Sequence, residues 1–202
     1  MLETLRQPKR RPAVIGPEDH GRAMSLEQFD RATAREGHLY ELNKGVIEVS
    51  DIPSPAHLTQ VNAVRDQIIL YQHAHPGIVH TVADGSGSKL LIGPSRSERH
   101  PDLTVYLTPP PDSPEIWSLW IPAIVVEVVS PSSKKRDYEE KPAEYLEFGV
   151  TEYWIVDSIK RCMTVLYRWR GQWKQTVLTP TQKYTTHLVP GLSLDLKRVL
   201  RS

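Results

Sequence analysis

The most constraining feature of this sequence is an apolar segment, residues 121–129, that contains a single charged residue, Glu127. A short segment this rich in β-branched residues is typical of a central strand that is buried on both faces of a sheet. An ionised carboxylate is costly there unless a cation offsets its lost hydration. Glu127 therefore needs a partner, and the candidates are Asp102, a divalent cation between the two carboxylates, and a lysine further along the chain. This combination indicates metal-dependent phosphodiester chemistry.

The composition limits the class of protein. A chain of 202 residues with 39% hydrophobic residues can form one substantial core. The formal net charge of +1, from 25 basic and 24 acidic residues, predicts no strong overall attraction to nucleic acid, so any basic surface must be local. The single cysteine, Cys162, cannot form an internal disulfide or a cysteine-rich zinc site. With no signal-peptide pattern and no long apolar run, we expect a soluble cytoplasmic protein.

The first third of the chain predicts an arm followed by the start of one domain. Residues 1–24, rich in Pro, Arg and Gly, are assigned to an N-terminal arm, and residues 25–202 to a single domain. Ser25 and Gln28 form a capping-box pattern at the start of a short helix. Residues 38–42 and 46–50 flank Asn43-Lys44-Gly45 and predict a hairpin. Apolar residues at spacings of three and four then predict a long helix over residues 57–74.

The rest of the chain alternates strands with one further helix. Strand patterns cover residues 78–83, 89–92 and 102–107, and we expect these three to form an antiparallel meander. The apolar strand at residues 121–129 follows, and then a helical region over residues 134–148, in which Pro142 favours a late start. Three further strands are predicted at residues 153–156, 163–169 and 173–178. This order predicts an α+β fold rather than regular βαβ alternation.

Three side chains are the main candidates for a site. If the strands that carry Asp102 and Glu127 are neighbours in register, the two carboxylates converge and can hold Mg²⁺ or Mn²⁺ together with water. Lys141 shares a helical face with aromatic residues, which is unusual for a lysine. Such a lysine could reach Glu127, where it would orient or deprotonate a water molecule and stabilise the negative charge that develops on the phosphate.

Four motifs occur in a characteristic order: His100-Pro101-Asp102, Glu127-Val128-Val129-Ser130-Pro131, Asp137 with Lys141, and Glu152-Tyr153-Trp154-Ile155-Val156-Asp157. With these motifs the chain resembles the Uma-two family of putative restriction endonucleases, in the PD-(D/E)XK nuclease superfamily. The likeness covers about residues 25–195. It implies a restriction-endonuclease-like mixed central sheet flanked by helices, Mg²⁺-dependent cleavage of DNA, and metal ligation by Asp102, Glu127 and the carbonyl of Val128.

The sequence departs from the superfamily pattern at one position. Val129 stands two residues after Glu127, where the superfamily pattern Glu-x-Lys has lysine. In the family the lysine is similarly displaced onto the next helix, so Lys141 is the matching residue. The resemblance also implies that Glu41 assists the site and that His57 lies beside it. By analogy with nucleases that cut both strands, we consider a homodimer.

Structural roles remain open for each of these residues. Glu127 could form only a buried ion pair, and Lys141 could extend along its helix to solvent. Asp102 follows a proline, as turn residues often do, Glu41 could only border the hairpin turn, and His57 could cap a helix. For the whole chain, the alternatives are a catalytically inactive DNA-binding or protein-interaction module and a hydrolase of a smaller phosphate ester.

Several basic side chains are candidates for phosphate contacts, although charge runs of this kind are usually solvated. They are Lys134-Lys135-Arg136, Arg96, Arg99 and Lys9-Arg10-Arg11.

Overall fold

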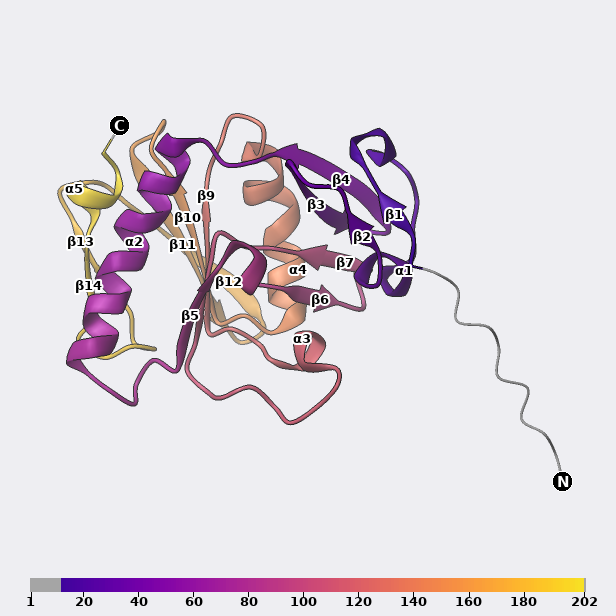
Figure 1. Ribbon diagram of the computed structural model, residues 1–202. Helices are drawn as coiled ribbons and strands as arrows, with labels where there is room; N and C mark the ends of the chain where they lie inside the picture. The colour runs from indigo at the N-terminus through magenta and orange to yellow at the C-terminus, as the bar shows by residue number, and fades with distance from the viewer. Residues whose placement is uncertain (1–11, 202) are drawn as a thin grey trace, which may run out of the picture.

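The computed structural model describes residues 12–201, in which a six-stranded and a four-stranded β-sheet pack with helices (Figure 1). The larger sheet has six strands in the order β12-β11-β10-β9-β8-β5. Only β9 and β10 are parallel neighbours, and the other pairs are antiparallel. The strands are β5 (Thr81–Asp84), β8 (Leu103–Tyr106), β9 (Ile124–Val128), β10 (Glu152–Asp157), β11 (Cys162–Trp169) and β12 (Gln172–Leu178). The predicted α+β class with a mixed central sheet is confirmed.

Helices cover both faces of the larger sheet around its central strand β9. The long helix α2 (Pro55–Ala74) lies on one face and packs with Val126 and Val128. The helix α4 (Lys141–Phe148) lies on the other face, where Tyr145 packs with Val125. Every residue of β9 is buried, which explains its apolar sequence, since each buried valine contributes about 1.5–3 kcal/mol of transfer free energy. Glu127 is carried on the α4 side of this strand.

The smaller sheet has the order β4-β3-β7-β6. It contains the predicted hairpin, β3 (His38–Asn43) and β4 (Val46–Asp51), whose turn residues Lys44 and Gly45 have φ of 51° and 82°. Positive φ at both positions is what a tight two-residue hairpin turn requires. The predicted capping box is also present, because Ser25 accepts a hydrogen bond from Gln28 at the start of α1 (Leu26–Asp30).

The predicted antiparallel meander is wrong. β5 pairs directly with β8, whereas the intervening segment leaves the larger sheet and pairs as β6 (Leu90–Ile92) with β7 (Ser97–Arg99) in the smaller one. The sequence pattern did not indicate β7, because its three residues are all polar. Strand pairing between distant segments depends on tertiary contacts that local patterns do not contain.

The helical region after β9 begins irregularly, as Pro142 indicated. A π-helical turn, η3 (Arg136–Glu140), precedes α4, whose first residue is Lys141. Pro142 lies in the first turn of α4, where its missing N–H is tolerated. Gly149 ends the helix with φ 110°. The junction of η3 and α4 therefore places Lys141 against the buried face of the larger sheet.

The remaining elements lie at the ends of the chain and in the connections. Residues 1–11 of the predicted arm lie outside the described residues, and the rest of the arm carries β1 (Val14–Ile15), which pairs with β2 (Thr33–Ala34). The other elements are η1 (Pro17–Asp19), η2 (Gly85–Gly87), α3 (Ile116–Leu119), β13 (Lys183–Thr185), β14 (Ser193–Asp195) and α5 (Leu196–Val199). Within residues 12–201, none of the helices has the length and apolar character needed to span a membrane.

Candidate active site

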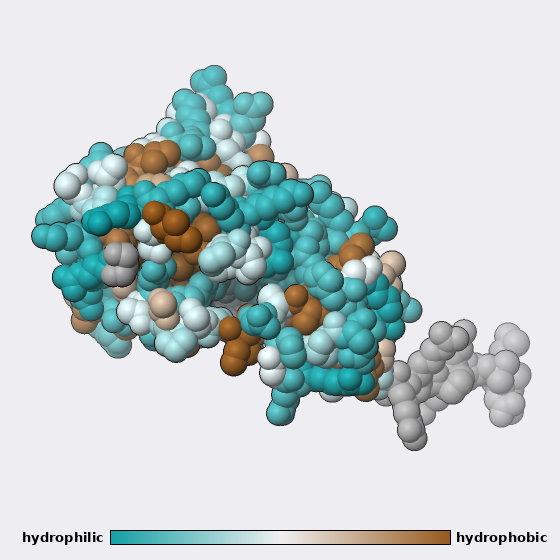
Figure 2. All heavy atoms as spheres, turned by 90° about the horizontal axis from the view of Figure 1, so that it is seen from above, coloured by the Kyte–Doolittle hydropathy of each residue, from teal (hydrophilic) through white to brown (hydrophobic). Residues whose placement is uncertain are grey.

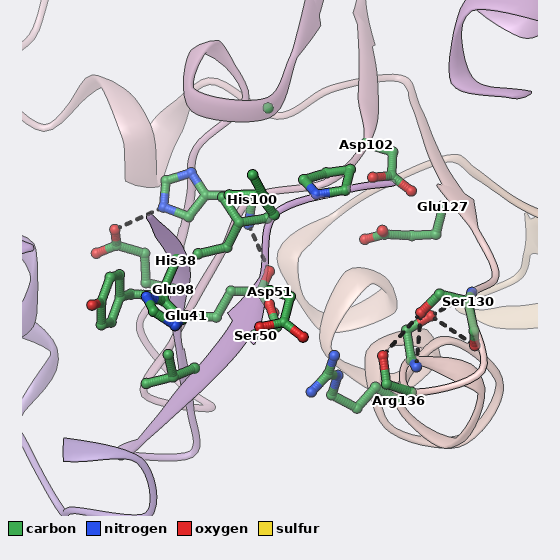
Figure 3. Close-up of a pocket in the computed structure, with 18 of the residues that line it drawn as sticks. His38, Glu41, Ser50, Asp51, Glu98, His100, Asp102, Glu127, Ser130 and Arg136 are labelled. Atoms are coloured by element: carbon green, nitrogen blue, oxygen red, sulfur yellow. Dashed lines mark hydrogen bonds and ion pairs between the residues drawn. The ribbon is translucent and has the colours of Figure 1, made fainter. Parts of the chain in front are cut away.

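Asp102 and Glu127 lie on neighbouring strands of the larger sheet. β8 and β9 are antiparallel with Leu103 opposite Val126, so Asp102, one residue before β8, comes opposite Glu127. The Asp102 Oδ2 atom accepts a hydrogen bond of 2.7 Å from the backbone N–H of Val128. The structure thus brings the two predicted carboxylates to the same part of the cavity, as Figure 3 shows.

Lys141 points from α4 directly at Glu127. Its Nζ atom lies 2.9 Å from Glu127 Oε1 and 3.0 Å from Asp137 Oδ1. The hydroxyl of Tyr145 donates a further hydrogen bond of 2.6 Å to Glu127 Oε1. Lys141 is only 5% exposed, so its side chain does not extend to solvent. Asp137, Lys141 and Tyr145 are four residues apart in turn, which places them on one side of the helical segment.

The charges of this group are unbalanced. Burial raises the pKa of Glu127 to about 8 against the opposing effect of Lys141, and the carboxylates of Asp102, Asp137 and Glu41 raise it further. Burial alone would lower the pKa of Lys141, but Glu127 and Asp137 outweigh it and hold the pKa above its ordinary value. The protonated form of Lys141 is therefore favoured, and two carboxyl groups share it. An added positive charge would favour the ionised form of Glu127.

Glu41 lies in the cavity wall but bonds to other residues. Its Oε1 accepts a 3.0 Å hydrogen bond from the backbone N–H of His100, and its Oε2 lies 3.2 Å from Nη1 of Arg99. Burial raises the pKa of Glu41, but the charges of Lys141 and Arg99 outweigh this effect and lower the pKa to about 2. Glu41 therefore contributes negative charge near the two carboxylates without touching either of them.

The suggestion that Arg99 contacts phosphates is wrong. Its side chain is fully buried, and its guanidinium binds the carboxylates of Glu144, Glu41 and Glu48. A guanidinium held in this way by three carboxylates is structural. The sequence does not distinguish it from a solvated arginine, because its partners come from three separate elements. Arg136, by contrast, lines the cavity, and Lys9, Arg10 and Arg11 lie outside the described residues.

His57 lies beside Asp102 rather than capping its helix. The cap of α2 is Ser54, whose hydroxyl accepts a 3.2 Å hydrogen bond from the backbone N–H of His57. The imidazole Nε2 lies 2.9 Å from Asp102 Oδ1. Burial lowers the pKa of His57, but the hydrogen bond and charge of Asp102 outweigh this effect and raise it. His57 thus holds one oxygen of Asp102, and the amide of Val128 holds the other.

A cavity of about 1000 Å³ joins these residues. Asp102, Glu127, Lys141, Glu41 and His57 all line it, together with the turn at residues 130–133. Figure 2 shows the molecule from above. Its surface is mainly hydrophilic and is hollowed near the middle of the molecule. Active sites are usually concave, with converging polar groups, and they often contain a carboxyl group whose pKa is strongly shifted.

The carboxylate and carbonyl oxygens in the cavity are ligands of the kind that Mg²⁺ prefers. Within residues 12–201, no three His, Cys, Asp or Glu side chains are grouped as a complete protein metal site. Mg²⁺ needs fewer protein ligands, because it is commonly bound by one or two carboxylates and keeps several waters. Extending the β8–β9 register places Pro101 opposite Val128, and proline has no N–H to give the Val128 carbonyl. The residues present therefore fit this ion.

Two residues of this group were not assigned a site role from the sequence. The carboxylate of Asp137, like that of Glu127, pairs with Lys141. The hydroxyl of Tyr145, like the ammonium of Lys141, contacts Glu127. Their signal was the repeat of four residues along the helical segment that contains Lys141. Asp137 lies four residues before Lys141 and Tyr145 four residues after it, so the spacing alone identifies both as neighbours of Lys141.

A mixed sheet with helices on both faces, carrying two carboxylates and a lysine in one cavity, defines a restriction-endonuclease-like protein. A family model described as "Putative restriction endonuclease", Uma2, matches residues 26–197. The chain therefore belongs to the Uma2, or Uma-two, family, and the resemblance inferred from its motifs is confirmed.

Comparison with solved structures supports the fold. A crystal structure of a putative nuclease belonging to DUF820 from Anabaena variabilis ATCC 29413 matches with a TM-score of 0.71 and 18% sequence identity. The match covers 88% of this chain and 97% of that one. Among curated proteins, no match was found.

Proposed function

We propose that this protein is a Mg²⁺-dependent endonuclease that hydrolyses phosphodiester bonds in DNA. The observation that carries the proposal is the meeting of Asp102, Glu127 and Lys141 in one cavity of about 1000 Å³. Membership of a family described as putative restriction endonucleases and the likeness to a putative nuclease support it. DNA as the substrate follows from the family description, and Mn²⁺ is expected to replace Mg²⁺.

In this proposal Asp102, Glu127 and the carbonyl of Val128 hold the ion. When bound, it polarises the scissile phosphate and lowers the pKa of a water molecule. The backbone N–H of Val128 and the imidazole of His57 fix the orientation of Asp102. A carboxylate held by two partners is preorganised and needs little rearrangement to act as a ligand.

Lys141 then serves as an electrostatic group. Glu127 and Asp137 raise the pKa of Lys141 and so favour its protonated form, which carries a positive charge rather than accepting a proton from water. Its buried charge is suited to stabilising the negative charge that grows on the phosphate oxygens. Of the two roles considered from the sequence, stabilisation of the transition state is therefore favoured. Glu41, in the cavity wall, adds negative charge that raises the pKa of Glu127 and of Lys141.

One observation favours the rival, a catalytically inactive DNA-binding or protein-interaction module. Both oxygens of Asp102 already have hydrogen-bond partners, and Lys141 already pairs with Glu127. These contacts would stabilise the fold even if no ion were bound. The rival therefore explains the same residues as structural ion pairs.

The test is incubation of purified protein with supercoiled plasmid, a single-stranded circle and bis(p-nitrophenyl) phosphate, each with Mg²⁺, Mn²⁺ or EDTA. Nicking or linearisation of DNA with either metal, and none in EDTA, is expected. Cleavage of the small diester alone would identify a hydrolase of smaller phosphate esters. No cleavage of any substrate would favour the inactive module.

A further inference from the structure

Four polar side chains form a chamber at one end of the same cavity. His38 and Tyr40 alternate along β3, and Glu98 and His100 alternate along β7 and the residue that follows it. Leu42 pairs with Glu98 in antiparallel register, so Tyr40 comes opposite His100. Alternation places all four side chains on one face of the smaller sheet, and all four line the cavity. Figure 3 shows His38, Glu98 and His100 across the cavity from Asp102 and Glu127.

Each of these side chains has a buried polar atom that lacks a hydrogen-bond partner among residues 12–201. The atoms are His38 Nδ1, Tyr40 Oη, Glu98 Oε2 and His100 Nδ1. Glu98 is 4% exposed and Tyr40 is 7% exposed. Buried polar groups are almost always paired, so a native structure needs a reason for each exception. Four exceptions on one face of one chamber indicate that a ligand supplies the missing partners.

The hydrogen-bonding pattern of the chamber is defined by Glu98. Its Oε1 is already bound by His100 Nε2 at 3.1 Å and by Lys89 Nζ at 3.3 Å. Its Oε2 remains as an acceptor for an N–H group of the ligand. If the neutral imidazole of His100 donates from Nε2 to Glu98, its Nδ1 is a second acceptor.

The walls beside these atoms are apolar and aromatic. Ile15, Phe29, Val49 and the ring of Tyr40 line the cavity. A planar ligand with an exocyclic amino group on one edge, and apolar faces above and below, fits such a chamber. Nucleobases have this form, and proteins that bind unpaired bases place them against aromatic side chains.

The chamber lies close to Asp102, a proposed ligand of the metal ion. His100 precedes Asp102 by two residues, about 7 Å of extended chain. A single nucleotide bridges such a span between its phosphate and its base. We propose that the chamber binds an unpaired nucleobase with an exocyclic amino group, from a nucleotide next to the phosphate that is cleaved. This inference rests on the proposed nuclease function and deepens it by naming the part of the substrate that is read.

The test is an equilibrium binding measurement that does not depend on catalysis. Fluorescence anisotropy in EDTA would compare short labelled oligothymidylates that carry one central adenine, cytosine or thymine. Thymine offers a single ring N–H, whereas the amino group of adenine or cytosine offers two N–H bonds, one each for Glu98 Oε2 and His100 Nδ1. The adenine and cytosine strands should therefore bind about tenfold more tightly, which is the effect of one additional hydrogen bond.

Two variants separate recognition from folding. Glu98→Gln replaces the acceptor carboxylate and should remove the preference for adenine and cytosine. Tyr40→Phe removes only a hydroxyl that has no partner, so it should weaken binding several-fold while the melting temperature stays the same or rises. Glu147 is exposed and does not line the cavity. The matched variant Glu147→Gln should keep the affinity and the preference of the wild type.

The results distinguish this inference from the nuclease proposal. Equal binding of the three strands by the wild type, a preference retained in Glu98→Gln, or unchanged affinity in Tyr40→Phe would overturn the base-binding chamber. Metal-dependent cleavage together with equal binding would leave the nuclease standing and remove only the chamber. A preference that Glu98→Gln loses and weaker binding by Tyr40→Phe, in a protein that cleaves nothing, would support the chamber and refute the nuclease.

Discussion

The Nζ atom of Lys141 lies 2.9 Å from Glu127 Oε1 and is almost as close to Asp137, 3.0 Å from Oδ1. One buried cation therefore serves two buried carboxylates, and Asp102 and Glu41 add negative charge nearby. The group as a whole has more negative than positive charge. This imbalance is the basis of the proposed metal site.

Removing the cation should destabilise the fold as well as the site. Lys141→Met leaves the carboxylates of Glu127 and Asp137 without their shared partner, and breaking a buried pair in this way costs about 3–5 kcal/mol. Chemical denaturation at neutral pH would measure the loss. Lys135, whose side chain is 75% exposed, provides the control, since Lys135→Met should change the free energy of unfolding by less than about 1 kcal/mol. Equal effects of the two variants would contradict the role given to Lys141.

A divalent ion should stabilise the folded protein by mass action. With Mn²⁺ at about 100 times its Kd, the expected gain is about 2.7 kcal/mol, which a thermal melt detects as a higher Tm than in EDTA. Asp102→Asn should abolish the rise, because it replaces a charged ligand with a neutral one. If the rise persisted in that variant, the ion would bind elsewhere.

Glu41 should make stability depend on pH in the acidic range. Its pKa falls to about 2 in the folded protein from an ordinary 4.5, so the ionised form is favoured by folding. The stabilisation is complete above about pH 4.5 and is lost as the pH falls toward 2, and it amounts to roughly 3 kcal/mol.

Urea denaturation between pH 6 and pH 3 would test this dependence in Glu41→Gln. The variant should be less stable than the wild type at pH 6, and the difference should shrink as the solution becomes more acidic. Glu147→Gln should follow the wild-type curve throughout. A constant difference between Glu41→Gln and the wild type would show that ionisation of Glu41 is not involved.

The glycine that ends α4 should be sensitive to a single methyl group. Gly149 has φ 110°, and a Cβ atom there would lie 3.0 Å from Cδ1 of Ile121. Gly149→Ala should therefore lower the free energy of unfolding by about 2 kcal/mol. Gly93 has open space around it and no positive φ, so Gly93→Ala should be close to neutral. Similar melting temperatures for both variants would argue against a strained end of α4.

Local patterns predicted the elements of the fold well but not all of their pairings. The capping box at Ser25, the hairpin turn at Lys44-Gly45 and the late start of α4 at Pro142 each depend on residues close in sequence, and each is confirmed. The meander prediction failed because β6 pairs with β7 in a second sheet. That partner is short and polar, and its last residue, Arg99, binds carboxylates from three other elements that a local pattern does not include.

The candidate site was predictable at positions where a charged residue stands in an otherwise apolar or aromatic pattern. Glu127 in an apolar strand and Lys141 in an aromatic helical face both required partners, and they are each other's partner. Arg99 was misjudged, because its type alone gives no sign of the three carboxylates that enclose it. The chamber lined by Glu98 and Tyr40 was not foreseen either, since unpaired atoms become visible only in three dimensions.

Cleavage of supercoiled plasmid by matched glutamate variants tests the central claim most directly. Wild type, Glu127→Gln and Glu147→Gln would be compared in Mg²⁺ and in EDTA, after thermal melts confirm that each is folded. We expect nicking in Mg²⁺ by the wild type and Glu147→Gln, a loss of at least about 100-fold in Glu127→Gln, and no nicking in EDTA. Equal nicking by Glu127→Gln, or nicking that persists in EDTA, would contradict a metal-dependent nuclease site at Glu127.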